Sequence, residues 1–181
     1  MDEKYNNILD RYKYESDCAI KSRVSSMNKS NVSENKDAIN EIVLWKLNRS
    51  IHISEETISL LNSISYLNNP HDILNDSRVC KLIEELLSTK GIKLAVASTI
   101  LHFYYPNIFP IIDQRSYREL TGKEYPIYSS KDRNKKYAEL YINYIGMCFQ
   151  FNMQECPEIP FEFIDKILYQ LDKEKGNAVK Y

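Results

Sequence analysis

Glycine and proline are scarce in this sequence, with only 4 glycines and 6 prolines among 181 residues. These two residue types supply many of the tight turns that a sheet of many strands requires. Their scarcity argues against an all-β fold and favours helices. Hydrophobic residues make up 43% and charged residues 27%, an ordinary balance for a globular chain. A chain of this length most simply forms one domain, residues 1–181.

Long apolar runs are also missing. No stretch approaches the roughly 20 apolar residues that cross a bilayer. The first residues, MDEKYNNILDRYKYESD, are too polar for a signal peptide. We therefore expect a cytoplasmic protein with no membrane partner.

The sequence lacks the usual spacings of metal ligands. The cysteines form no C-x-x-C pair, and no histidines stand at ligand spacing, so we expect neither a metal nor another cofactor. The residues concerned are Cys18, Cys80, Cys148 and Cys156, together with His52, His71 and His102. A net charge of −1 argues against a large nucleic-acid footprint, which is usually basic overall, but leaves room for a local basic patch.

Apolar residues recur at helical spacing along most of the chain, which predicts an all-α fold of about seven to nine helices. The polar stretch 22–36 is expected to be a flexible loop, and the tail 173–181 is expected to fray. The predicted helices cover residues 4–21, 35–49, 54–67, 76–89, 94–104, a segment starting after Asp113, 132–152 and 161–171.

The helix predicted at 35–49 places a cation on its apolar side. Lys46 falls within an arc that also holds Trp45, and Arg49 falls inside the same arc. A lysine at such a position snorkels, pairs with an acid or lines a cleft. All three readings remain open from the sequence.

The most informative stretch runs from residue 90 to residue 120. Residues 94–104 are apolar or small on nearly every face, which predicts a buried helix. Pro106 indicates that this helix ends at or before Tyr105. Asp113 follows two isoleucines and precedes a helical pattern, the position of an N-cap. Its carboxylate would accept backbone N–H bonds at the positive end of a helix dipole.

This order of elements resembles the helix-hairpin-helix superfamily of base-excision DNA glycosylases, in particular the 8-oxoguanine glycosylase branch. The hairpin of the family corresponds to residues 89–97, within a helix-hairpin-helix-like element near 80–104, and Asp113 matches the aspartate before the following helix. Lys93 stands where the family has a second glycine. Ala95 stands where the family has its catalytic lysine, so the resemblance implies a monofunctional enzyme.

The resemblance implies cleavage of the N-glycosidic bond of a modified base in double-stranded DNA. Asp113 would stabilise an oxocarbenium-like transition state after the base leaves the stack and enters a pocket. Lys46 and Lys93 are the candidates to replace the missing nucleophile. The oligomeric state stays open.

Further site residues follow from the same resemblance. Lys90, Gly91, Ile92 and Lys93 would hold a DNA phosphate at the start of a helix, with an exposed helix turn as the alternative. Arg115 and Arg118 would contact phosphate or form salt bridges. The predicted pocket wall consists of Ala95, Ser98, Thr99 and His102, together with Trp45. The alternative is that the helical face of the first four residues is exposed to solvent or packs against a neighbouring helix.

A second interpretation assigns no catalysis. Asp113 would then be a helix cap worth roughly 1 kcal/mol. The protein would be a non-catalytic helical module with a glycosylase-like fold that binds nucleic acid or protein, with bacterial phage defence as its setting.

Overall fold

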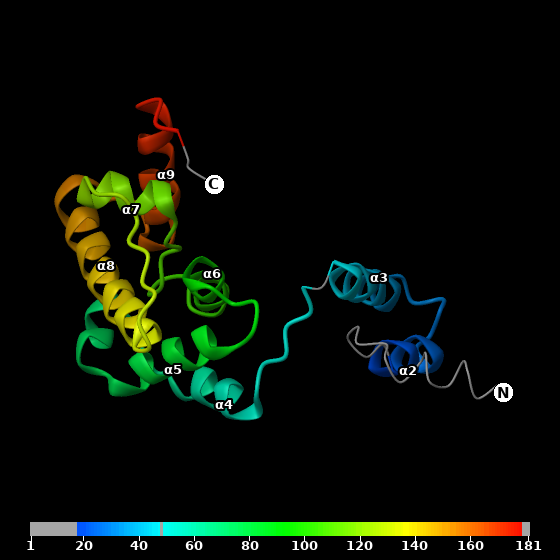
Figure 1. Ribbon diagram of the computed structural model, residues 1–181. Helices are drawn as coiled ribbons and strands as arrows, with labels where there is room; N and C mark the ends of the chain where they lie inside the picture. The colour runs from blue at the N-terminus through cyan, green and yellow to red at the C-terminus, as the bar shows by residue number, and fades with distance from the viewer. Residues whose placement is uncertain (1–17, 48, 179–181) are drawn as a thin grey trace. The chain divides into compact units, whose positions relative to one another are not determined.

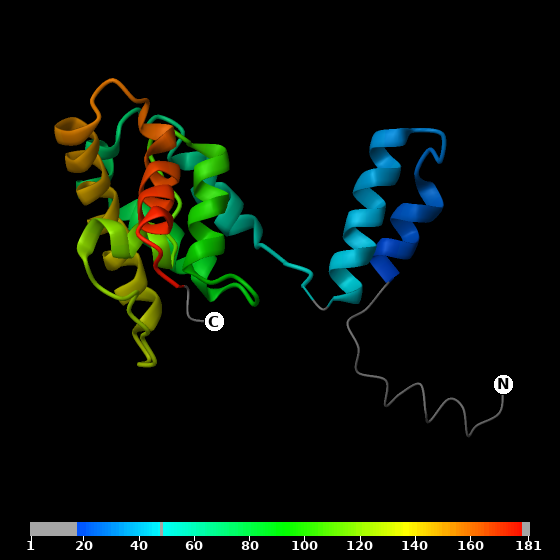
Figure 2. The same ribbon diagram turned by 90° about the horizontal axis from the view of Figure 1, so that it is seen from above.

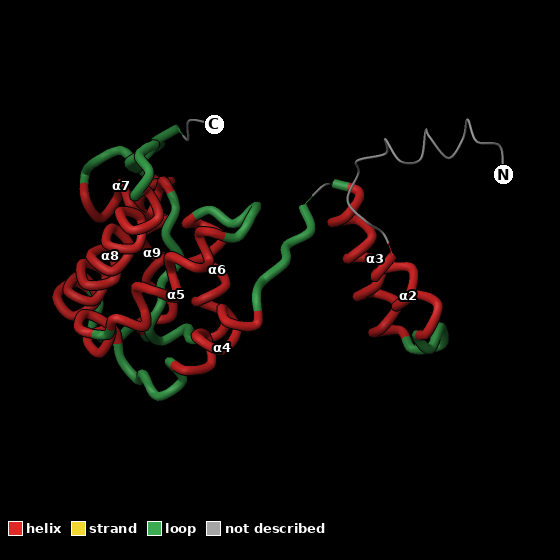
Figure 3. The backbone as a smooth tube through the Cα atoms, turned by 60° about the horizontal axis from the view of Figure 1, so that its bottom comes forward, coloured by secondary structure: helices red, strands yellow, loops and turns green. Residues whose placement is uncertain are grey.

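The computed structural model describes residues 18–47 and 49–178. Within these ranges the chain forms eight α-helices and two short 3₁₀ helices and contains no strand (Figures 1 and 3). The predicted all-α class is therefore confirmed. Most of the helix expected at 4–21 lies outside the described residues.

The helices follow one another with short connections. In chain order they are α2 (Cys18–Ser26), α3 (Val32–Lys46), α4 (Glu55–Ser63), the 3₁₀ helix η1 (Pro70–Asn75), α5 (Ser77–Ser88), α6 (Leu94–Tyr104), α7 (Gln114–Thr121), α8 (Arg133–Glu155), the 3₁₀ helix η2 (Phe161–Phe163) and α9 (Ile164–Glu174). None of these described helices is both long and apolar enough to cross a membrane.

The chain divides into two compact units, residues 1–51 and 52–181. The single domain expected over 1–181 stays a prediction, and each unit is described by itself. In the first unit α2 packs against α3. Asn31 caps α3 by accepting hydrogen bonds from Ser33 N and Glu34 N. The loop expected at 22–36 is therefore wrong for most of its length, because helix occupies all of it except residues 27–31.

The second unit has an apolar core built from every helix after α3. α5 and α8 pack together, and α7 packs against α9. Figure 2 shows the long α8 helix along one edge of this unit. The largest fully buried side chains include Tyr141, Tyr144 and Phe109. Most of the tyrosines on the apolar stripe of α8 therefore serve the core.

Helix α6 has the predicted bounds but not the predicted burial. One face, including Ala97, Ser98 and Leu101, is buried. The opposite face carries Val96 and Phe103, which are 39% and 79% exposed. The apolar composition was an incomplete guide because only one side of α6 meets the rest of the unit.

The C-terminal segment is held in place further than expected. Helix α9 ends at Glu174, and the carbonyls of Asn177 and Ala178 accept hydrogen bonds from Arg115 and Arg118. The fraying predicted from residue 173 is therefore wrong up to residue 178. Residues 179–181 lie outside the described part.

Candidate functional site

A glycine turn joins α5 to α6, as the sequence predicts. Gly91 has a φ of +89°, a left-handed conformation that suits glycine. Ile92 is buried, and its N–H donates to the Thr89 carbonyl at 3.1 Å. This N–H is therefore occupied and not offered to a phosphate, which corrects part of the predicted anion site. Lys90 and Lys93 are exposed.

At the start of α6, the backbone N–H groups receive no capping hydrogen bond from the N-cap side chain. Lys93 is the N-cap residue, and its side chain makes no capping hydrogen bond. The first N–H groups of an α-helix have no partner within the helix. An anion at this end of α6 would therefore meet backbone donors and the Lys93 ammonium together.

The irregular segment between α6 and α7 is fixed by buried side chains from two helices. From α6, His102 Nδ1 lies 2.9 Å from the Phe109 carbonyl, and Ser98 Oγ accepts from Ile112 N at 3.2 Å. From α8, Tyr141 donates to the Pro110 carbonyl at 2.9 Å and Tyr144 donates to the Ile111 carbonyl at 3.3 Å. Residues 109–112 are thus held to the core one after another.

This fixed segment ends at Asp113, the N-cap of α7. Asp113 Oδ1 accepts from Ser116 N at 2.8 Å, and Asp113 N donates to Ser116 Oγ at 3.0 Å. The reciprocal pair is a capping box, so the predicted cap is confirmed. Because Asp113 is only partly buried, its carboxylate combines a fixed position with contact to solvent.

Asp113 lines a cleft of about 550 Å³ in the second unit. The cleft also contains three predicted site residues from the hairpin, namely Ile92, Lys93 and Ala95. The other lining residues are Leu87, Leu94, Gln114, Tyr125, Ile127, Tyr128, Arg133, Asn134 and Tyr137. The structure therefore brings the aspartate before α7 and the hairpin before α6 into one concave surface.

Tyrosines form an aromatic wall of this cleft. The rings of Tyr128 and Tyr137 meet edge to face with centroids 4.9 Å apart. Tyr125 meets Tyr117 in the same way at 5.6 Å. Burial, with the neighbouring charges of Tyr137 and Asp113 adding to it, holds the pKa of Tyr125 well above its usual value. Its phenol therefore stays neutral at ordinary pH.

This aromatic wall was not predicted from the sequence. Tyr125, Ile127 and Tyr128 stand in a loop, where polar residues are more usual. Ile127 is 89% exposed at the edge of the cleft. The apolar character of a loop segment was the signal that could have identified this surface.

The two arginines after Asp113 are engaged in the interior of the unit. Arg118 Nη2 and Arg115 Nη1 lie 2.8 and 3.1 Å from Asp172 Oδ2. Asp172 is fully buried, and the two arginine side chains are only 15% and 16% exposed. Of the two predicted roles, the ion pair is the one observed. These contacts join α7 to α9 and argue against a phosphate role for either arginine.

The other predicted pocket residues on α6 do not all line the cleft. Ala95 lines the cleft, whereas Ser98 and His102 are buried and bind the segment before Asp113. Thr99 donates to the Ala95 carbonyl at 2.8 Å within α6. The predicted wall is thus corrected to one cleft residue and two residues that position the loop.

Trp45 and Lys46 belong to α3 in the first unit. Their predicted roles beside Asp113 stay predictions. Within the described part of the chain, no group of three or more His, Cys, Asp or Glu side chains is arranged to hold a metal ion.

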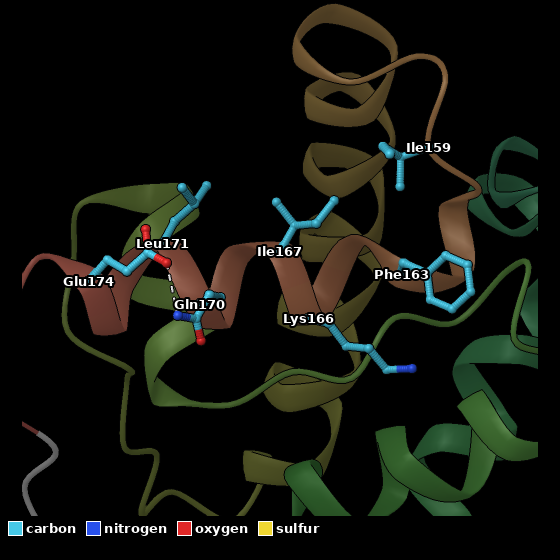
Figure 4. Close-up of a pocket in the computed structure, with 7 residues that line it drawn as sticks. All are labelled: Ile159, Phe163, Lys166, Ile167, Gln170, Leu171 and Glu174. Carbon is cyan, nitrogen blue, oxygen red and sulfur yellow. Dashed lines mark hydrogen bonds between the residues drawn. The ribbon is translucent and has the colours of Figure 1, made fainter.

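A second depression lies along α9 but has a different character. It is an open apolar groove whose lining includes Ile159, Ile167 and Leu171 (Figure 4). Lys166 points away from the side on which Ile167 and Leu171 lie. The polar side chains Gln170 and Glu174 in its lining hydrogen-bond to each other at 2.8 Å, so the groove is a weaker candidate for a reaction site than the cleft at Asp113.

Comparison with known proteins adds no relative: no family model, curated protein or solved structure matches this chain.

Proposed function

We propose that this protein is a DNA base-excision glycosylase that cleaves the N-glycosidic bond of a modified base without lyase activity. The observation that carries the proposal is the meeting of Asp113, Lys93 and an aromatic wall in one cleft. The cleft would receive a base that has left the duplex.

Each part of the cleft suits one feature of that substrate. Flat tyrosine rings and the apolar side chains of Leu87 and Ile127 offer a surface for a base. Lys93 and Arg133 are exposed cations beside the cleft, suited to the phosphates on either side of the base. The amides of Gln114 and Asn134 supply donors and acceptors for the edge of a base.

Asp113 would be the catalytic residue. As the glycosidic bond lengthens, positive charge develops on the sugar ring, and a nearby carboxylate stabilises it. A group that stabilises a transition state must be held still beforehand, and the hydrogen bonds along residues 109–113 provide that rigidity. Ala95 has no amine, which supports hydrolysis by water in preference to a Schiff base.

The test is a screen of duplexes that carry single oxidised, deaminated or alkylated bases, with borohydride added in a parallel set. We expect release of a base from at least one duplex, an alkali-labile abasic site, and no trapped covalent adduct. A trapped adduct that Lys93→Ala abolishes would overturn the monofunctional assignment.

Failure to release a base from any duplex would overturn the glycosylase proposal. Retained binding to duplexes in a fluorescence anisotropy assay, without base release, would instead favour the non-catalytic module. In the screen Asp113→Asn should lose base release. Asp132→Asn is the matched control for Asp113→Asn, because Asp132 is an exposed aspartate that also precedes a helix.

A further inference from the structure

A second hollow lies next to Asp113. It measures about 360 Å³ and is lined by Ile111, Asp113, Asp165, Lys166, Tyr169 and Gln170. Asp113 is the residue that this hollow shares with the cleft. The same carboxylate therefore borders two spaces, of which the cleft is the one assigned above to the base.

Asp165 is the unusual residue of the hollow. It stands in the first turn of α9, is only 6% exposed, and its Oδ1 has no hydrogen-bond partner. Buried carboxylates are normally paired or fully hydrogen-bonded, because removing a charge from water is costly. An orphaned buried oxygen therefore calls for an explanation beyond packing.

Nearby cations do not supply that explanation. The Lys166 ammonium lies 5.0 Å from the centroid of the Phe163 ring. Among the described residues no salt bridge reaches Asp165. A function that requires a carboxylate at this position would account for the cost of burying it.

The surroundings of Asp165 favour proton transfer. Burial raises the pKa of its carboxyl, whereas the charges of His102 and Lys166 and hydrogen bonds from the backbone N–H groups of Lys166 and Asp165 act in the opposite direction. Asp113 faces the same hollow. Tyr141 and Cys148 of α8 are also within electrostatic reach, but burial raises the pKa of both, so they stay neutral. A carboxylate with a raised pKa is a more effective base than an exposed one.

We propose that Asp165 is the general base of the reaction and that the hollow holds the attacking water between Asp165 and Asp113. This inference rests on the proposed glycosylase function. Asp113 stabilises the positive sugar, and Asp165 accepts the proton of the water. The polar groups of Gln170 and Tyr169 complete a site with the several partners that a bound water needs.

The step balances without a further reactant. The water oxygen bonds to the anomeric carbon, and the bond from that carbon to the base nitrogen breaks. The electron pair of the broken bond stays on the base nitrogen, which takes a proton from solvent. The proton that the water loses passes to the Asp165 carboxylate and then to solvent.

Single-turnover rates of base release test the proposal, measured for the wild type, Asp165→Asn and the control Asp132→Asn across a range of pH. We expect Asp165→Asn to slow release by about 10²- to 10⁴-fold and to remove the fall in rate at acid pH. Azide needs no general base, so we expect it to restore part of the rate of Asp165→Asn and to form a glycosyl azide. Asp132→Asn should match the wild type.

The outcomes separate the two proposals. A wild type that releases base, with Asp165→Asn at the same rate and pH profile, overturns the role of Asp165 and leaves the glycosylase function standing. A slow Asp165→Asn that azide does not accelerate shows a structural role and also overturns the inference. A wild type that releases no base overturns both. If Asp165→Asn does not fold, Asp165→Ser replaces it, because serine also lacks a carboxylate, and a wild-type rate and pH profile in that variant overturn the role.

Discussion

The amide of Ile112 donates a hydrogen bond of 3.2 Å to the hydroxyl of Ser98. This contact joins the residue before Asp113 to the middle of α6, whose first turn borders the same cleft. Ser98 is fully buried and also donates to the Ala95 carbonyl at 2.9 Å. The hairpin side and the carboxylate side of the cleft are therefore coupled through one hydroxyl.

Ser98→Ala should destabilise the protein by about 1–3 kcal/mol, because it leaves the Ile112 N–H without its partner. Urea unfolding measures this change. Thr99→Ala is the matched control: its hydroxyl binds the same Ala95 carbonyl but not the loop. We expect a change of about 0.5 kcal/mol or less for the control. Equal effects for the two variants would show that the Ser98–Ile112 bond adds nothing.

Asp172→Asn should weaken the protein at neutral pH and change its response to acid. Hydrogen bonds from Arg118 first, then from Asn177 and Arg115, lower the pKa of Asp172 from 3.8 to about 2. A lowered pKa in the folded state gives stability that is present above pH 3.8 and lost as the pH falls towards 2.

Thermal unfolding between neutral and acid pH tests this role of Asp172. The wild type should lose the Asp172 contribution over the acid range, whereas Asp172→Asn should lack that part of the dependence. Asp132→Asn removes an exposed carboxylate whose pKa is also lowered by hydrogen bonds from Ser130 and Lys136, and because solvent screens this pair the variant should change the curve only slightly. A wild-type acid response in Asp172→Asn would contradict the buried ion-pair assignment.

Asp165→Asn should have the opposite effect on stability. Because burial raises the pKa of Asp165, the folded state holds its proton more tightly than the unfolded chain does. Stability therefore falls as the pH rises from the ordinary value of 3.8 through the raised pKa. Above that range the ionised carboxylate is a cost, which the amide removes.

Differential scanning fluorimetry at mildly acid and neutral pH measures this difference. We expect the melting temperature of Asp165→Asn relative to the wild type to increase towards neutral pH. A variant that is less stable than the wild type at neutral pH, by the same margin as in acid, would show that the carboxylate is a structural anchor.

Cysteine labelling of the folded protein should separate Cys18 from Cys148. Cys18 is exposed, whereas burial raises the pKa of the fully buried Cys148 thiol far above its usual value. Thiolate is the reactive form. Mass spectrometry after brief iodoacetamide treatment should find Cys18 modified and Cys148 intact until denaturant is added. Rapid labelling of Cys148 without denaturant would contradict the packing of α8.

Sequence patterns predicted the features that depend on local chemistry. The bounds of α6 follow from its apolar run and Pro106, and Asp113 caps α7 as expected. Caps are predictable because donor and acceptor lie within three residues of each other. Asn31 was overlooked as a cap because the Ser- and Asn-rich composition around it suggested a loop.

The partners of residues that make contacts over long sequence distances were not predicted. Arg115 and Asp172 are 57 positions apart, and nothing local to Arg115 indicates that it is buried against α9. Ser98 and His102 share a helical face with Ala95, but the loop from residue 109 folds back over them and excludes them from the cleft. Asp165 interrupts the apolar stripe of α9, which was the one sequence signal for the second hollow.

The most direct measurement is the single-turnover rate of base release by Asp113→Asn, on the duplex from which the wild type releases a base fastest. Asparagine is also a good N-cap, so the variant should melt close to the wild type and isolate the effect of the charge. We expect the rate to fall by about 10²-fold or more. Base release by Asp113→Asn at the wild-type rate would contradict a catalytic role for this carboxylate.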